Sequence, residues 1–241
     1  MAVGYTSDTD QTPATSSSIV YTSFAVSGTN PVILLLIGLN SATATVSSVV
    51  LSAGLSGGTP VEFTLRNDTT YLSLWCIPAP TGTGTITATL SASVDWQSNA
   101  ILMSGADQTT PCPSGAGNTG TATGEATNPL VITLGNLTAN DAAVGFGANT
   151  LAGDHPDWMN NGDAASGDTF FNNSTNVNMA GGYRLGTGDV SMNWVATSGT
   201  DSFLAVRVVA AAGGAGPTTA QTMPAMFMEN VHSTMIGRRL I

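Results

Sequence analysis

Small polar and apolar residues alternate along much of the chain with a period of two. The clearest example is residues 83–90 (TGTITATL). This period is typical of a β-strand with one buried face. Residues 73–77 alternate in the same way and end at a turn rich in proline and glycine, which cannot continue a hydrogen-bonded ladder. Together with the apolar run 99–104, the stretch 73–111 predicts three consecutive strands joined by turns.

Residues 31–39 (PVILLLIGL) are apolar at nearly every position. A run of this kind predicts a strand covered on both faces, at the centre of a sandwich or against a neighbouring subunit. Further half-buried strands are expected at 19–26, 46–51, 61–65, 130–134, 142–148, 179–185, 188–194 and 203–209. About ten antiparallel strands fit two packed sheets with Greek-key connections, a jelly-roll-like β-sandwich.

Some connections can be predicted from the same pattern. Strands 46–51 and 61–65 should follow one another in a meander, and 130–134 should pair with 142–148. The polar residues 1–18 form either an edge strand or an arm. Residues 112–128, rich in glycine and threonine, have the composition of a long functional or flexible loop.

Composition supports an all-β chain, because there is no lysine and there are only three glutamates among 241 residues. The length and the 42% hydrophobic content allow a sizeable core in one main domain. We expect that domain to span residues 1–211. A linker of Gly, Ala, Pro and Thr at 212–222 and a C-terminal arm at 223–241 follow it.

The charge is sparse and one-sided, with fifteen acids against five arginines and a formal net charge of −10. Residues 1–211 carry fourteen acids and three arginines, hence −11, whereas the remainder carries +1. Nucleic-acid binding needs basic side chains that neutralise phosphates, so DNA and RNA are poor partners. No run is long enough to cross a bilayer, and the first residues lack the pattern of a secretory signal. We therefore expect synthesis in a cytoplasm, with exit only inside a particle or by lysis.

The two cysteines, Cys76 and Cys112, are too few for a disulfide framework. A bridge between them is sterically possible. A buried cysteine in a strand more often behaves as a small hydrophobe, so both alternatives stay open at this point.

Catalytic patterns are weak. A glycosidase needs two carboxylates of defined separation, yet Glu62 and Glu125 are far apart in the sequence and no two acids lie two or four apart inside a predicted strand. Neither of the two histidines, His155 and His232, accompanies a G-x-S-x-G nucleophile motif. The prediction is a protein that is not an enzyme and that uses no cofactor.

The polar segment 153–178 raises two binding hypotheses. Its acids could offer oxygen ligands to calcium, but the spacing is not that of an EF-hand and a solvated acidic loop is the preferred interpretation. Among the four tryptophans, Trp158 is the one expected to be exposed, as a glycan contact or an interface anchor. The calcium candidates are Asp154, Asp157, Asp163 and Asp168.

The C-terminal arm has apolar residues spaced by threes and fours, which indicates a short amphipathic helix or a hydrophobic arm. Its methionines and phenylalanine cannot be covered by so short a segment, so it is predicted to bind a partner. The predicted partner-binding residues are Met223, Met226, Phe227, Met228, Val231, Met235, Ile236, Arg238 and Arg239.

Several segments resemble one family of domains. The strand that leads into PAPTGTGTITATLS, the strand that leads into SGADQTTP, the opening strands at 19–39 and the closing pair at 188–194 and 203–209 are similar to a β-sandwich domain recurrent in secreted bacterial proteins and phage virion proteins. The likeness covers residues 3–211. It implies a jelly-roll-like fold and, since such folds host unrelated functions, little about chemistry.

The expected function is a structural virion protein of a bacteriophage, a head-decoration or fibre-like subunit. Its termini would hold it to the capsid or to neighbouring copies in a homo-oligomer, without nucleic-acid or membrane contacts. It would be made in the host cytoplasm and reside in the virion. The alternative is a glycan-binding β-sandwich module that acts at a cell surface, with Trp158 in its site.

Overall fold

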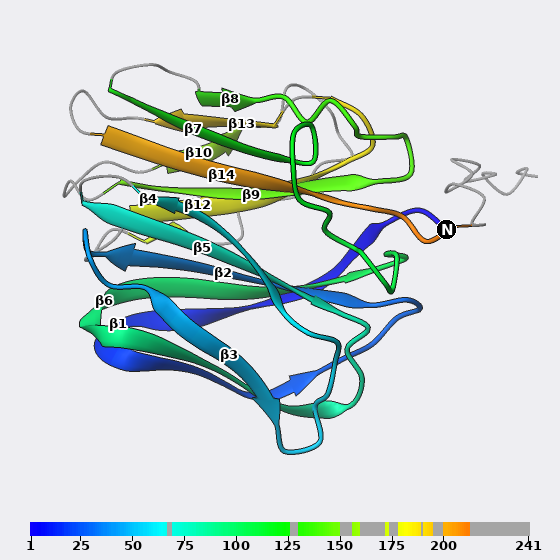
Figure 1. Cartoon of the computed structure of the whole chain (residues 1–241), viewed down its shortest axis with the longest axis horizontal. Helices are drawn as coiled ribbons and strands as arrows, with labels where there is room; N and C mark the ends of the chain where they lie inside the picture. The colour runs from blue at the N-terminus through cyan, green and yellow to red at the C-terminus, as the bar shows by residue number, and fades with distance from the viewer. Residues whose placement is uncertain are drawn as a thin grey trace, which may run out of the picture.

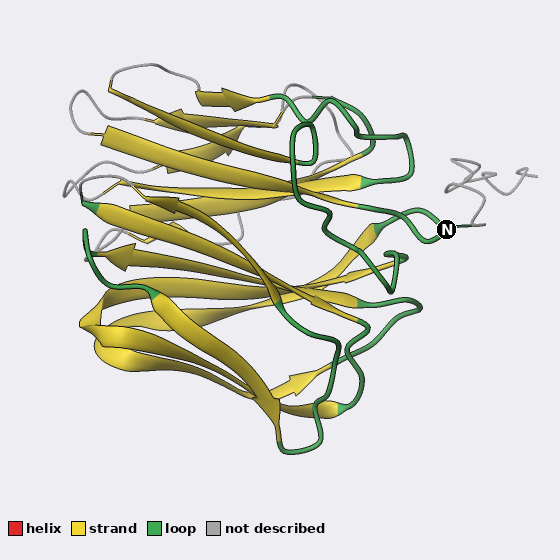
Figure 2. Cartoon of the chain, in the orientation of Figure 1, coloured by secondary structure: helices red, strands yellow, loops and turns green. Residues whose placement is uncertain are grey.

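The computed structural model describes residues 1–66, 69–125, 130–149, 156–159, 172–173, 178–188, 190–194 and 200–212. Within these residues every regular element is a β-strand (Figure 2). The strands form antiparallel sheets that pack face to face, as predicted for an all-β sandwich.

The largest sheet has six strands, in the order β1-β6-β2-β5-β4, with β3 also paired to β6. It contains β1 (Gly4–Ala25), β2 (Val32–Asn40), β3 (Val46–Ser52), β4 (Val61–Arg66), β5 (Thr70–Pro78) and β6 (Thr83–Ser104).

A five-stranded sheet, in the order β11-β12-β9-β14-β7, packs on one face of the six-stranded sheet (Figure 1). It contains β7 (Thr119–Glu125), β9 (Ala142–Asn149), β11 (Asn172–Asn173), β12 (Asn178–Leu185) and β14 (Thr200–Val208). A small sheet, β10-β13-β8, contributes Ile132 to a third apolar cluster with Phe203 of β14. Its strands are β8 (Leu130–Ile132), β10 (Pro156–Met159) and β13 (Val190–Trp194).

Strand β2 is buried on both faces, which confirms the prediction for the apolar run 31–39. Its even-numbered residues, such as Leu34 and Leu36, join Phe146 and Leu204 in the core between the two large sheets. Its odd-numbered residues, Ile33, Leu35 and Ile37 among them, belong to a second core. A Cβ on Gly38 would lie 2.1 Å from the sulfur of Met179, so a side chain at this position of β2 would displace the Met179 side chain.

The second core exists because the six-stranded sheet coils on itself. Strand β6 runs for 22 residues, and both of its halves contribute to this core, Ile86 and Leu90 from the first and Ala100 and Leu102 from the second. The first half pairs with β3, whereas the second half pairs with β2. Figure 1 shows the result, with β3 and the early part of β6 curving away below β2 and β5.

Two predicted breaks between strands are therefore absent. The predicted strands 83–90 and 99–104 are one continuous strand, because residues 94–98 between them keep their pairing with β1. In the same way, the predicted edge strand or arm at 1–18 joins 19–26 in β1, an edge strand with register shifts at four places. Such irregularities protect an exposed edge from pairing with another chain.

Three predicted connections are wrong. Strand β3 pairs with β6 and β4 pairs with β5, so the two form no meander. Strand β8 pairs with β13, whereas β9 lies between β12 and β14. The predicted loop 112–128 contains β7, which pairs with β14. Its sequence, TGTATGE, has no large apolar residue, and at one position the space is taken by a neighbour, since a Cβ on Gly120 would lie 2.2 Å from Ile132 Cγ2.

Candidate functional site

Most of the predicted binding residues lie outside the described part of the chain. This applies to all nine residues of the C-terminal arm and to Asp154, Asp163 and Asp168. The backbones of Asp157 and Trp158 are described, and they lie in β10 opposite Asn193 and Met192 of β13. The segment predicted as a polar loop thus contains a short strand at the position of Trp158.

The coiled end of the large sheet presents an outer face made only of serine, threonine and valine. Thr87 of β6 lies between Val20 of β1 and Val50 of β3, in register across the three strands. The alternate residues of these strands, such as Ile19, Val49 and Ile86, point into the second core. We call this surface the Ser/Thr/Val face; it comprises Ser18, Val20, Ser48, Val50, Ser52, Thr85, Thr87 and Thr89.

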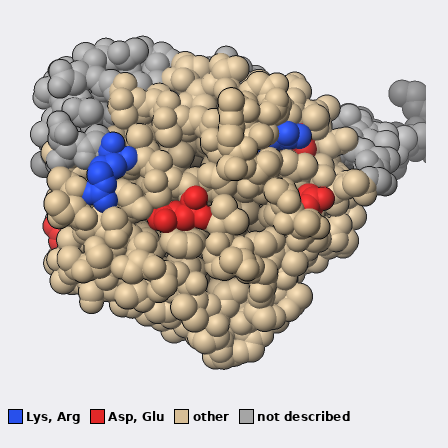
Figure 3. Space-filling view, in the orientation of Figure 1, with Lys and Arg blue, Asp and Glu red and all other residues tan. Residues whose placement is uncertain are grey.

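The Ser/Thr/Val face has no charge and exposes large apolar side chains. Val20 is 41% exposed and Val50 is 53% exposed, whereas the buried residues that alternate with them are almost inaccessible. In Figure 3 the surface over β3 likewise carries neither acidic nor basic side chains. The face is an uncharged outer surface with two exposed valines in register, and we take it as the candidate contact surface.

Asp8 and Asp10 form a second cluster. They contradict the expectation from the sequence that no two acids lie two residues apart inside a strand. Asp8 and Asp10 lie in β1, and the Asn99 Nδ2 amide donates to both, at 3.0 Å to Asp8 Oδ2 and 2.7 Å to Asp10 Oδ1. Burial, and then repulsion by Asp8, raise the pKa of Asp10 to about 6, while the bond from Asn99 acts in the opposite direction. The polar stretch 1–18 hid this pair, because its pattern did not decide between a strand and an arm.

The ionisation of Asp10 makes the stability of the folded chain depend on pH. Its pKa is raised from 3.8 to about 6 in the folded chain, so the folded state binds the proton more tightly between these values. The contribution of Asp10 to stability therefore falls as the pH rises from about 4 to about 6. We expect Asp10→Asn to raise the melting temperature at pH 7.5 and to change it little at pH 4.

Asp8→Asn should lower the pKa of Asp10, as measured by NMR titration. An unchanged pKa of Asp10 would rule out repulsion between the two carboxylates.

Glu62 is part of a separate network that joins β4 to β5. Its Oε1 accepts hydrogen bonds from the Tyr71 hydroxyl at 2.9 Å and from Ser73 Oγ at 2.6 Å. The Arg66 guanidinium lies 4.6 Å from the centre of the Tyr71 ring. Burial, reinforced by Glu62, raises the pKa of Tyr71, so its hydroxyl remains a donor. Glu125 ends β7 in the other large sheet, so the two glutamates weighed as a pair lie on different sheets.

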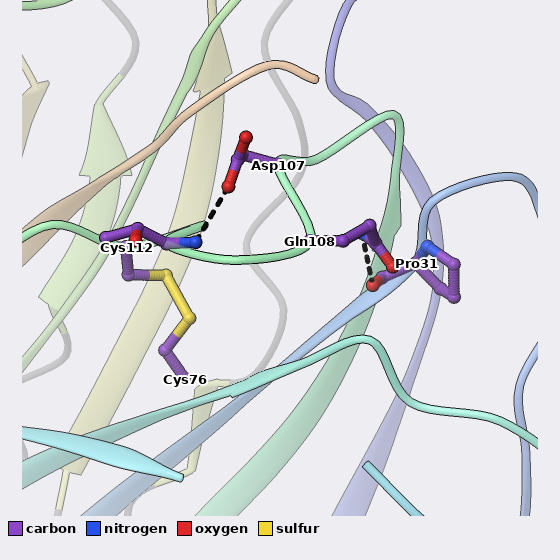
Figure 4. The surroundings of a disulfide bond; sticks show 6 residues. Pro31, Cys76, Asp107, Gln108 and Cys112 are labelled. Carbon is purple, nitrogen blue, oxygen red and sulfur yellow. Dashed lines mark hydrogen bonds between the residues drawn. A yellow bond between two sulfur atoms is a disulfide. The ribbon is translucent and has the colours of Figure 1, made fainter. Parts of the chain in front are cut away.

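The structure also decides between the two alternatives for the cysteines. Cys76 of β5 and Cys112 form a disulfide, with Cα atoms 6.4 Å apart and both residues in the main core (Figure 4). The loop that carries Cys112 is fixed by further bonds. Asp107 Oδ1 accepts from the backbone N–H groups of Thr109 and Thr110. Gln108 Nε2 donates to the Pro31 carbonyl at 3.1 Å (Figure 4).

A pocket of about 360 Å³ lies over this disulfide. We call it the disulfide pocket. Its apolar lining comes from Val61, Pro78, Pro111 and the two cysteines, and Thr109 and Thr110 contribute hydroxyl groups.

The described residues contain no group of three or more His, Cys, Asp or Glu side chains placed to hold a metal ion. In the same part of the chain, no helix is long and apolar enough to cross a membrane. Comparison with known proteins finds no matching family model, no matching curated protein and no matching solved structure. The class that the structure defines is an antiparallel all-β sandwich.

Proposed function

We propose that this chain is a structural subunit of a virus particle, a bacteriophage head-decoration or fibre-like protein that contacts neighbouring subunits. The observation that supports this proposal is the Ser/Thr/Val face, an uncharged outer sheet surface with two exposed valines. Residues 3–211 also resemble a β-sandwich domain that recurs in secreted bacterial proteins and in phage virion proteins, a resemblance that motivates the proposal but has no match among family models, curated proteins or solved structures.

The neighbour on this face is a second copy of the chain. A formal net charge of −10 makes two copies repel each other across most surfaces. The Ser/Thr/Val face brings no like charges together. The centres of protein interfaces are depleted of charged residues in the same way. Valine side chains supply apolar area there, and the hydroxyl groups between them remain able to form hydrogen bonds.

The Ser/Thr/Val face is too small for a stable free dimer, so its size indicates a contact that forms only within a larger assembly. Three strands about 4.8 Å apart, each contributing about five residues at about 3.3 Å, cover a few hundred Å². A stable free dimer needs about 800 Å² from each partner. The isolated chain should therefore be monomeric at micromolar concentration, while repeated weak contacts on a particle add through their high effective concentration.

Adding charge to this face tests the proposal. We expect the double variant Val20→Asp/Val50→Asp to keep the fold, because exposed substitutions usually change stability by less than about 0.5 kcal/mol. Its occupancy on particles should fall several-fold, since aligned carboxylates of adjacent copies would repel. The matched control is Val131→Asp on β8, a valine that is 45% exposed outside this face. Equal occupancy of the double variant and the control would contradict the proposal.

The alternative function, glycan binding at a cell surface, depends on Trp158 in β10. A glycan array distinguishes it from the virion proposal. Specific binding that is lost in Trp158→Ala, by a protein absent from particles, would favour the alternative. Occupancy on particles without glycan binding would favour the structural subunit.

A further inference from the structure

Strand β3 has one free edge. Among the described residues its strand partner is β6, which lies on one side of it. In an antiparallel strand, alternate residues direct their backbone N–H and C=O groups to opposite sides, so about half of these groups in β3 point away from β6. Within the described part of the chain, the backbone of residues 46–51 makes no hydrogen bond outside the ladder with β6.

A hollow of about 340 Å³ borders this edge. Val49, Val50 and Leu51 of β3 line one side of it, and residues 55–58 and Pro60 line the other. Val50 is 53% exposed, and Leu51 is only half-buried. The middle of β3 is therefore open to solvent beside its unpaired backbone groups.

The other outer strands of the six-stranded sheet carry features that keep an edge from pairing with another chain, whereas β3 does not. Strand β1 has register shifts at four places, and β4 contains the charged residues Glu62 and Arg66. Strand β3, with the sequence VSSVVLS, has no charged residue and no proline. Its ladder with β6 is regular from Ser48 to Ser52. An edge of this kind is a template for one more strand.

We propose that the free edge of β3 pairs with β3 of a second copy, antiparallel and related by two-fold symmetry. The charge distribution favours a second copy over a charged partner. Residues 11–61 carry no charge, so two such edges approach without repulsion, and the edge has nothing with which to attract a charged peptide.

The sequence of β3 is complementary to itself. With the two-fold axis at Val50, this valine faces its own counterpart, and Ser48 faces the second copy's Ser52. On the core side, Val49 faces the second copy's Leu51. Apolar side chains thus lie opposite apolar ones and hydroxyl groups opposite hydroxyl groups, and matched cross-strand pairs of these kinds stabilise a sheet.

Pairing at β3 would join the Ser/Thr/Val faces of two copies into one surface. Each face is formed by β1, β6 and β3, with β3 at its margin, so two faces become six adjacent strands with twice the area. A single strand pair is a small contact, and it should form at millimolar rather than micromolar concentration. The pairing goes beyond the proposed function and does not depend on it, because it is a property of the free chain.

Nitroxide labels on the full-length chain test the geometry. Val50→Cys and Val20→Cys are labelled in separate samples, and electron paramagnetic resonance measures the distance between the two copies' labels at millimolar concentration. Edge pairing places the Val50 positions about 5 Å apart and the Val20 positions five strand spacings apart, about 24 Å. The distance for Val20 should therefore be longer by roughly 20 Å. Stacking of one face on the other would give similar distances, because β1 and β3 lie on either side of β6.

Charge variants provide a matched comparison. Val50→Lys should weaken the dimer about fivefold in sedimentation equilibrium, which corresponds to about 1 kcal/mol, because two lysines would face each other across the axis. Val20→Lys makes the same change in net charge two strands away from the edge and should leave the dimer unchanged. Equal label distances, equal effects of the two lysines, or a wild-type chain that stays monomeric at millimolar concentration would each overturn the proposal. None of these results decides whether the chain occupies particles, which is the separate test of the proposed function.

Discussion

Leu35→Asp is expected to abolish folding of the soluble protein. Leu35 is fully buried at the centre of β2, opposite Trp75 of β5 and Ala100 of β6. The new carboxylate would enter the second core without a partner, since its surroundings there are the apolar side chains of that cluster. Burial of an unpaired charge costs several kcal/mol, a large share of the roughly 5–15 kcal/mol that stabilises a typical domain.

The measurement is the soluble yield and melting temperature of the variant. Val50→Asp is the matched control, because the same substitution is made on the opposite side of the same coiled sheet, where the valine is 53% exposed. Leu35→Ala adds a graded test and should cost about 2–5 kcal/mol through the lost side chain and the cavity left behind. Soluble Leu35→Asp protein that melts like the wild type would disprove the burial of β2 on both faces.

Loss of the Cys76–Cys112 disulfide is expected to lower the free energy of unfolding by about 3–4 kcal/mol. The bridge closes a loop of 36 residues, and such a crosslink removes conformational freedom from the unfolded chain. The loop includes all of β6, which pairs with three other strands.

Urea denaturation with and without a reductant measures this contribution. The midpoint of the wild type should fall under reducing conditions, whereas Cys76→Ala/Cys112→Ala should have a low midpoint that the reductant does not change. Since reducing compartments keep thiols free, the bridge should form only in an oxidising environment. An unchanged wild-type midpoint in reductant would show that the bridge adds nothing to stability.

The sequence predicted a strand correctly wherever burial alone determines which positions are apolar. The run 31–39 predicted a strand covered on both faces, because a polar residue at any of its central positions would be buried. Strand partners were predicted less well. The period of two is the same whichever strand lies alongside, so nothing local indicated that β3 pairs with β6 and β4 with β5. Strand β7 escaped detection because its sequence, TGTATGE, has no large apolar residue to mark a buried face.

The Ser/Thr/Val face shows the same difference between what a local pattern predicts and what depends on strand pairing. The alternation in 83–90 predicted that Thr85, Thr87 and Thr89 would face outward. Only the register places Val20 and Val50 on either side of Thr87, because the three strands are about thirty or more residues apart in the sequence. Asp8 and Asp10 likewise became a pair once the first eighteen residues were known to form a strand. Local patterns therefore predicted single strands, while surfaces that combine strands required the structure.

The central claim, that the chain is a structural subunit of a virus particle, is tested most directly by cryo-electron microscopy of particles purified from cells that express the chain. We expect sandwich-shaped density at a regular stoichiometry, with the Ser/Thr/Val face of one copy against a neighbouring copy. Particles that lack the chain, together with a monomeric protein recovered only from the soluble fraction, would contradict it.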